Sequence, residues 1–271
     1  MNKNQVILIV IAIAAVFGLY SLPRVVVDND NDEVNEFVNE SMPGGVEDHN
    51  SEIPEEIQPK IDFWKSQLLA NGNIQPESEV LDSLMAVYMT INQYDSAAYY
   101  AEQFANRFNS TNNWLKAGNA YFEAFTFAID QQKINLLGSK AREAYQKVLE
   151  AEPGNLDVKH NTALTYVSSS SPMQGIMMLR EIIQEDPKNL KALMSMGRMS
   201  IQTGQFENGI ERFQSLVNYY PEHIEGNFFL GVCYYEAGQL VKARAQFEKI
   251  KTLDASEQVM TAANEYLERI K

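Results

Sequence analysis

Three prolines spaced 34 residues apart are the feature that most constrains this chain. Pro153, Pro187 and Pro221 each follow a short amphipathic segment, such as AREAYQKVLEAEPGN at 141–155. A fixed period between 20 and 50 residues indicates an array of stacked structural repeats. The repeat therefore has to be defined before any local motif is interpreted.

Each period contains small residues at helical spacing in both of its halves. In the first half, a small residue is followed three positions later by a second column, in the pairs Gly118 and Tyr121, Ala163 and Tyr166, Gly197 and Ser200, and Gly231 and Tyr234. The second half contains three such columns. The first holds small residues, Ala141, Gly175, Gly209 and Ala243. Large residues follow after four positions, namely Tyr145, Leu179, Phe213 and Phe247, and after three more positions, namely Val148, Ile182, Leu216 and Ile250. These spacings place the columns on helix faces. A small residue lets two helix backbones approach, so each period is predicted to be a helical hairpin that buries its face by stacking.

These columns resemble those of the tetratricopeptide repeat family, whose 34-residue unit carries a W, LG, Y, A, F, A, P pattern. Trp114, Gly118, Tyr121, Ala141, Tyr145 and Pro153 match one unit, and LGVCYYEAGQLVKARAQFEKI at 230–250 matches another. The resemblance covers roughly residues 78–271. It implies an all-α fold, a right-handed superhelical solenoid of helical hairpins that works as a binding scaffold.

We predict an accessory helix within 57–77, five repeat units and a terminal helix. The units are 78–110, 111–155, 156–189, 190–223 and 224–255, and the capping helix is 256–271, with Ser256 as its N-cap. The first unit departs most from the pattern, with Met85 where a small residue is expected and Asn109 where the proline is expected. Terminal repeats are commonly atypical, so this departure is tolerated.

The second unit contains 11 extra residues. Gly118 and Ala141 are 23 positions apart, whereas the corresponding distance in the other units is 12. Eleven residues are close to three helical turns, so both helices are expected to grow longer without rotating their packed faces. Two alternatives remain for the apolar residues of this extension, Phe127, Ile134, Leu136 and Leu137: cover by a helix with the stripe Ile57, Ile61, Trp64 and Leu68, or cover by a partner protein.

The N-terminal region carries an apolar segment and then an acidic one. Residues 6–22, VILIVIAIAAVFGLYSL, contain no charge, which predicts an uncleaved signal anchor, a transmembrane helix within 1–27. A cleaved signal peptide is the alternative. Residues 28–56 are predicted to be an acidic disordered tether, since the stretch from Asp28 to Pro59 contains 11 acidic residues and no basic one. Lys3 ahead of the span places the N-terminus in the cytoplasm and the repeats outside.

Composition and motifs point away from several functional classes. The net charge of −14 disfavours nucleic acid as a partner. No catalytic or nucleotide-binding motif occurs, so we expect no enzymatic activity, no cofactor and no small-molecule substrate. Asp28, Asp30 and Asp32 begin like a calcium loop, but Glu33 replaces the turn glycine, and no metal site is expected.

Single histidines and the lone cysteine are given structural interpretations. His49, His160 and His223 are scattered and lack metal-ligand spacing, so we interpret them as isolated polar residues on solvated faces. Cys233 lies within a predicted helix one residue before Tyr234 and is interpreted as a buried small apolar residue.

The resemblance implies that the first helix of each unit lines a concave peptide-binding groove. The residues carried onto that groove are Asn112, Leu115, Asn119, His160, Asn161, Leu164, Lys191, Met194, Arg198, Phe228, Val232 and Tyr235. Co-chaperone members of the family hold a carboxylate with a clamp of five residues. Asn119, Asn161 and Lys191 fall on three of its columns, whereas Leu115 and Ser195 occupy the other two.

Arg198 lies one turn from Ser195 and could replace the missing clamp cation. Lys191 and Arg198 would then form a cationic spot that attracts a peptide carboxylate. The alternative is an ordinary solvated helix face.

These features together predict a membrane-tethered scaffold for protein–protein interactions in the cell envelope. The predicted location is the bacterial inner membrane, with a single span and with the C-terminal repeats in the periplasm. Three alternatives remain. The first is an assembly factor or chaperone-like subunit, for example in cytochrome c maturation. The second is an accessory subunit of a membrane enzyme, and the third is a small-ligand or glycan binder.

Overall fold

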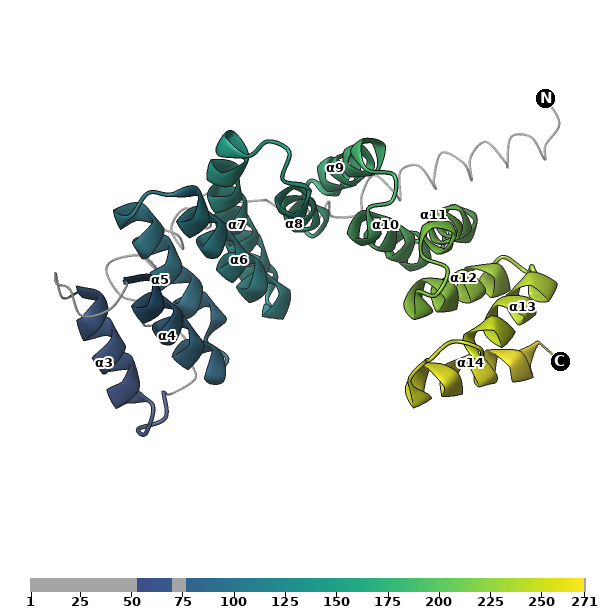
Figure 1. Ribbon diagram of the computed structural model, residues 1–271, viewed down its shortest axis with the longest axis horizontal. Helices are drawn as coiled ribbons and strands as arrows, with labels where there is room; N and C mark the ends of the chain where they lie inside the picture. The colour runs from purple at the N-terminus through teal and green to yellow at the C-terminus, as the bar shows by residue number, and fades with distance from the viewer. Residues whose placement is uncertain (1–52, 70–76, 271) are drawn as a thin grey trace, which may run out of the picture. The chain divides into compact units, whose positions relative to one another are not determined.

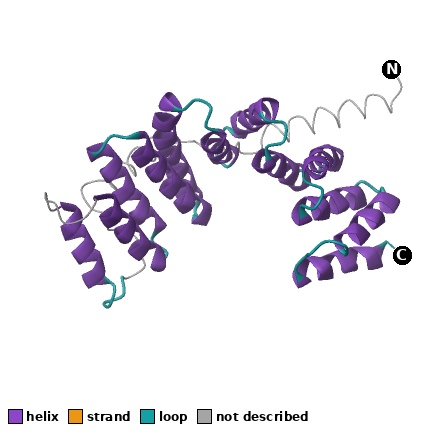
Figure 2. Ribbon diagram, in the orientation of Figure 1, coloured by secondary structure: helices purple, strands orange, loops and turns teal. Residues whose placement is uncertain are grey.

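The computed structural model describes residues 53–69 and 77–270, and these two stretches form only helices, turns and loops (Figures 1 and 2). The helices are α3 (Gln58–Leu69), α4 (Glu77–Thr90), α5 (Tyr94–Arg107), α6 (Thr111–Phe127), α7 (Gln131–Ala151), α8 (Leu156–Val167), α9 (Pro172–Glu185), α10 (Leu190–Gln202), α11 (Phe206–Tyr219), α12 (Ile224–Glu236), α13 (Leu240–Ile250) and α14 (Glu257–Arg269).

Several predicted N-terminal features lie outside the described residues. They are the apolar span, most of the acidic tether, the aspartates of the calcium-like sequence and His49. Among the helices of 53–69 and 77–270, none is both long enough and apolar enough to span a bilayer.

Consecutive helices pack in pairs, and the pairs stack along the chain. The pairs are α4 with α5, α6 with α7, α8 with α9, α10 with α11, and α12 with α13 (Figure 1). In addition, α6 contacts α8 and α10 contacts α12, so first helices of neighbouring pairs lie beside each other. We call the surface formed by α6, α8, α10 and α12 the first-helix face.

The three periodic prolines occupy one recurring turn between pairs. Before each proline, the C-cap N–H of α7, α9 or α11 donates to a carbonyl four residues back at 2.8 Å. Two residues after each proline, Asn155, Asn189 or His223 accepts a hydrogen bond from the backbone N–H three residues ahead, which caps the next helix. Proline cannot continue the first helix, and the capping residue two positions later starts the next one. This turn therefore sets the 34-residue repeat.

In three pairs a glycine of the first helix faces an aromatic ring of the second. A Cβ atom on Gly118 would lie 2.6 Å from the ring of Tyr145, one on Gly197 2.5 Å from Phe213, and one on Gly231 2.8 Å from Phe247. All three rings are fully buried. In the pair of α8 and α9 the glycine is on the second helix, where a Cβ on Gly175 would lie 2.3 Å from the carbonyl oxygen of Ala163.

Cys233 is buried, as the sequence predicts. A Cβ atom on Gly209 would lie 2.7 Å from its sulfur, so the glycine of one pair makes room for the cysteine of the next. Burial raises the pKa of the Cys233 thiol to about 12, which keeps the thiol protonated.

The 11 extra residues lengthen both helices of the second pair, so that α6 has 17 residues and α7 has 21. Leu137 is buried and Ile134 is half-buried, whereas Phe127 is 58% exposed and Leu136 41% exposed. The extension is held by the start of α5. The ring of Tyr94 stacks on Phe127 with centroids 4.3 Å apart, and Lys133 forms an ion pair with Asp95.

Of the two alternatives for the extension, cover by the α3 stripe does not match the main packing of α3. Ile61 is fully buried, but α3 packs against α4, and Lys65 of α3 lies over the rings of Tyr88 and Tyr100. The stripe covers the first pair instead of the extension.

At the other end, α14 closes the last pair through buried Ala263 and Leu267 and through Tyr266, whose ring stacks on Phe247 at 4.8 Å. Ser256 is at the N-cap position of α14, as predicted, but its side chain makes no capping hydrogen bond.

The close approach at the glycine column can be tested by adding one methyl group. We expect Gly231→Ala to destabilise the fold by about 1–3 kcal/mol through overpacking, because the Phe247 ring is fully buried and cannot move away. Gly154→Ala is the matched control, since a Cβ there meets no atom within 4 Å. Urea unfolding followed by circular dichroism measures both. Equal stabilities for the two variants would show that the Gly231 contact is not tight.

Candidate functional site

A chain of hydrogen bonds crosses the first-helix face. The hydroxyl group of Tyr145, on α7, donates to Oδ1 of Asn119 on α6 at 2.9 Å. The same hydroxyl oxygen accepts from Nδ2 of Asn161 on α8 at 3.1 Å. One buried tyrosine therefore fixes two asparagine side chains on neighbouring first helices.

His160 extends this chain to α10. Its Nδ1 lies 3.3 Å from Oδ1 of Asn161, and its Nε2 lies 2.9 Å from Oγ of Ser195. Because an amide oxygen only accepts, Nδ1 of His160 carries the proton and Nε2 accepts from the Ser195 hydroxyl. We call Asn119, Tyr145, Asn161, His160 and Ser195 the polar network.

The structure corrects the interpretation of two histidines as residues on solvated faces. His160 is buried, with 7% of its surface exposed. His223 is half-buried and caps α12 through Nδ1, which accepts from the N–H of Gly226 at 3.0 Å. Both rings are held by specific hydrogen bonds.

Burial sets the protonation of the polar network. It lowers the pKa of His160, and the charge of Lys191 lowers it further, against opposing effects of Asn161 and Asp157. Burial likewise raises the pKa of the Tyr145 hydroxyl. Both groups are therefore neutral near pH 7, which matches the directions of their hydrogen bonds.

The two cations of the predicted clamp are paired with carboxylates from neighbouring first helices. Lys191 of α10 contacts Asp157 of α8, with Nζ and Oδ1 2.7 Å apart, and Arg198 of α10 forms an ion pair with Glu225 of α12. The guanidinium of Arg198 also lies over the ring of Phe229. Both cations are therefore compensated by carboxylates, although these pairs are exposed and each is worth only about 0–1 kcal/mol.

Most of the other residues carried onto the groove are at least partly buried. Met194 and Val232 are buried, and Leu115 and Leu164 are half-buried. The polar residue Asn112 is exposed. Phe228 and Tyr235 are half-buried and contact Tyr266 of α14, with ring centroids 6.1 Å and 5.1 Å apart. The C-terminal end of the first-helix face is thus partly covered by α14.

The role of Tyr145 does not follow from the repeat pattern, which places this residue in the packing column that also contains Leu179, Phe213 and Phe247. The signal was the hydroxyl group, which the other three residues lack and which a buried site must satisfy.

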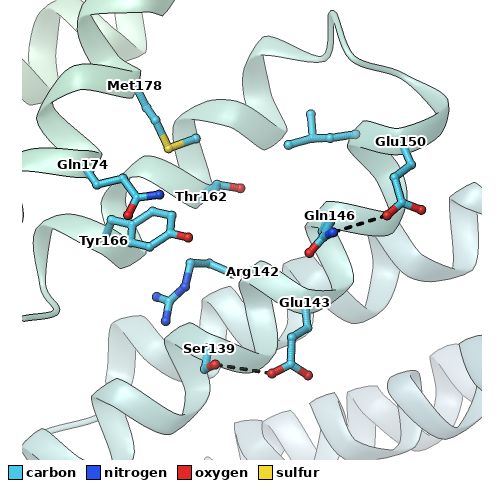
Figure 3. Close-up of a pocket in the computed structure, with 10 residues that line it drawn as sticks. Ser139, Arg142, Glu143, Gln146, Glu150, Thr162, Tyr166, Gln174 and Met178 are labelled. Carbon is cyan, nitrogen blue, oxygen red and sulfur yellow. Dashed lines mark hydrogen bonds between the residues drawn. The ribbon is translucent and has the colours of Figure 1, made fainter. Parts of the chain in front are cut away.

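A hollow of about 520 Å³ lies between α7, α8 and α9 (Figure 3). Its lining comes from all three helices and combines charged and polar groups with apolar surface. The lining residues are Ser139, Arg142, Glu143, Gln146, Leu149, Glu150, Thr162, Tyr166, Gln174 and Met178.

Comparisons with known proteins agree with this helical-pair architecture. Residues 191–223 match the family model for the tetratricopeptide repeat. A tetratricopeptide repeat protein from Parabacteroides merdae is similar in structure, with a TM-score of 0.54 and 13% identity over 86% of this chain and 82% of that one. MamA from Desulfovibrio magneticus RS-1, from its residue 41 onward, has a TM-score of 0.50 and 17% identity over 68% of this chain and 99% of that one. At these identities the likeness shows the fold alone. No match is found among curated proteins.

The burial of His160 predicts a pH dependence of stability. Because its folded pKa is lowered, the unfolded chain binds a proton more readily than the folded one as the pH falls below the ordinary histidine value of about 6.5. The stabilisation is complete above that value and is lost as the pH falls through the folded pKa. We expect wild type to lose more thermal stability between pH 7.5 and 5 than His160→Gln does. Equal losses in melting temperature would contradict the burial of a neutral imidazole.

Proposed function

We propose that this chain is a membrane-tethered scaffold of tetratricopeptide repeats that binds an extended peptide segment of a protein partner on its first-helix face. The observation that carries the proposal is the polar network. In this network one buried hydroxyl group, that of Tyr145 on α7, holds the side chains of both Asn119 and Asn161.

Asn119 is the residue that the polar network leaves available for a partner. Its side chain is exposed, its Oδ1 accepts from Tyr145, and its amide nitrogen donates to no side chain or carbonyl of the described chain. An amide group in this orientation can donate to a backbone carbonyl of an extended peptide. Because the amide is already ordered, less side-chain entropy is lost on binding.

The charge pattern favours recognition of peptide backbone and apolar side chains over recognition of a terminal carboxylate. Lys191 and Arg198 already face Asp157 and Glu225, and two of the five clamp columns hold Leu115 and Ser195. Binding a carboxylate at either cation would require it to displace an existing partner.

The proposed tether and location rest on the sequence of the N-terminal region. The uncharged run at 6–22 is proposed to anchor the protein in the bacterial inner membrane, and the acidic segment at 28–56 to separate the repeats from the bilayer. In this arrangement the repeats are in the periplasm, where they can hold a partner near the membrane.

Removal of the Tyr145 hydroxyl tests the binding proposal. We expect Tyr145→Phe to reduce recovery of copurifying partners from membranes several-fold, because both asparagine side chains lose their shared contact. The loss of two hydrogen bonds, at about 0.5–1.5 kcal/mol each, should cost about 1–3 kcal/mol of stability, so the array stays folded. Copurified proteins are identified and quantified by mass spectrometry with the tagged full chain.

The matched control is Tyr234→Phe. The Tyr234 hydroxyl donates to Oε1 of Gln214 at 2.9 Å, and neither residue belongs to the polar network. This variant should recover the same partners at wild-type yield. Equal recovery by wild type and Tyr145→Phe would refute the binding proposal.

The tether is tested by fractionation of the full-length protein. We expect it to remain in the membrane pellet after carbonate extraction and to lose its repeats to protease added outside the inner membrane. A variant lacking residues 1–27 should be recovered in the soluble fraction. Isolation of a soluble mature wild-type form that begins near Ser21 would exclude the anchor.

A further inference from the structure

The hollow between α7, α8 and α9 contains a guanidinium group with no carboxylate partner. Arg142 lies over the ring of Tyr166, with the guanidinium carbon 4.6 Å from the ring centroid (Figure 3). One of its nitrogens donates to the backbone carbonyl of Thr165 at 3.4 Å. Throughout 53–69 and 77–270, no carboxylate lies within ion-pair distance of it.

Two neighbouring lysines, unlike Arg142, are paired with carboxylates. Lys140, also on α7, pairs with Glu102 at 3.2 Å, and Lys159 on α8 pairs with Glu185 at 2.8 Å. A guanidinium has five N–H donors in a planar fork that fits a carboxylate. The ring of Tyr166 lies against this fork, and one of its nitrogens donates to Thr165, so the other donors can bind a ligand.

The rest of the hollow limits what can bind beside the guanidinium. On α7, Glu143 accepts from Ser139 at 3.3 Å and Glu150 accepts from Gln146 at 3.4 Å, each within its own helix. These two carboxylates disfavour a strongly acidic ligand. Met178, on α9, is half-buried and offers an apolar wall on the opposite side (Figure 3).

We propose that this hollow is a second binding site, which takes one glutamate or aspartate side chain flanked by apolar residues from an internal segment of a protein partner. The carboxylate binds the fork of Arg142, and a flanking apolar side chain packs against Met178. The volume of about 520 Å³ is within the range of ~300–1,000 Å³ usual for ligand sites.

This site is separate from the polar network. Tyr166 and Thr162 follow His160 by six and two residues, which places them about 240° and about 200° away from it around α8. The two sites therefore use different sides of one helix, and each can be removed without the other.

Two blocked tripeptides test the proposal, acetyl-Leu-Glu-Leu-amide and its neutral counterpart acetyl-Leu-Gln-Leu-amide. The full-length chain, labelled with 13C at its methionine methyl groups, is titrated with each peptide in mild detergent. We expect the glutamate peptide to shift the Met178 resonance and to bind about tenfold more tightly than the glutamine peptide, since a charge-assisted hydrogen bond discriminates between them. Met194, on the first-helix face, should not shift.

Variants assign the effect to the guanidinium. Arg142→Gln should abolish the preference for the glutamate peptide, and Arg142→Lys should retain part of it because the charge remains without the fork. Arg180→Gln is the control, since it removes an exposed arginine of α9 that does not line the hollow.

Two results would overturn the proposal: equal affinity for the two peptides, or a preference that survives in Arg142→Gln. Tyr145→Phe should leave tripeptide binding unchanged, so a failure of the proposed partner face and a failure of this second site are distinguishable.

Discussion

The structure depends on the close approach of two helices where a small residue faces a large one. Gly118, Gly197 and Gly231 each admit a buried aromatic ring that a single added carbon would displace. A glycine inside a helix costs about 1 kcal/mol relative to alanine. Burial of an aromatic side chain of 150–250 Å² at about 25 cal/mol per Å² stabilises by several kcal/mol, which more than offsets that cost.

One member of this packing column also organises the candidate site. Phe213 and Phe247 only fill space, whereas Tyr145 fills the same space and carries a hydroxyl group to the edge of the first-helix face. There the hydroxyl contacts Asn119 and Asn161, and the bonds continue through His160 to Ser195. The pair of α6 and α7 therefore packs like the other pairs, but the hydroxyl group of Tyr145 gives it a different surface chemistry. The same geometry that holds α6 against α7 orients the side chains proposed to meet a partner.

Local periodicity was sufficient to predict the helical pairs, the glycine and aromatic columns and the lengthening of α6 and α7, because each depends on residues a few positions apart. The candidate site depends on side chains that meet across pairs. The hydroxyl of Tyr145 contacts asparagines 26 and 16 residues away, and Lys191 finds its carboxylate 34 residues away. Residue type alone gave no indication that His160 would be buried between α8 and α10. The Asp157 and Glu225 partners of Lys191 and Arg198 were equally unpredictable without the stacking of neighbouring pairs.

The most direct test of the account is the hydrogen-bonded state of Tyr145 in solution. Nuclear magnetic resonance of the labelled full chain can detect its hydroxyl proton and the side-chain amide of Asn161. A hydroxyl held between two asparagines in a buried site exchanges slowly with water. We expect an observable hydroxyl resonance with close contacts to the side-chain amide protons of Asn161. A rapidly exchanging hydroxyl, together with an Asn161 amide that behaves like that of an exposed asparagine, would contradict it.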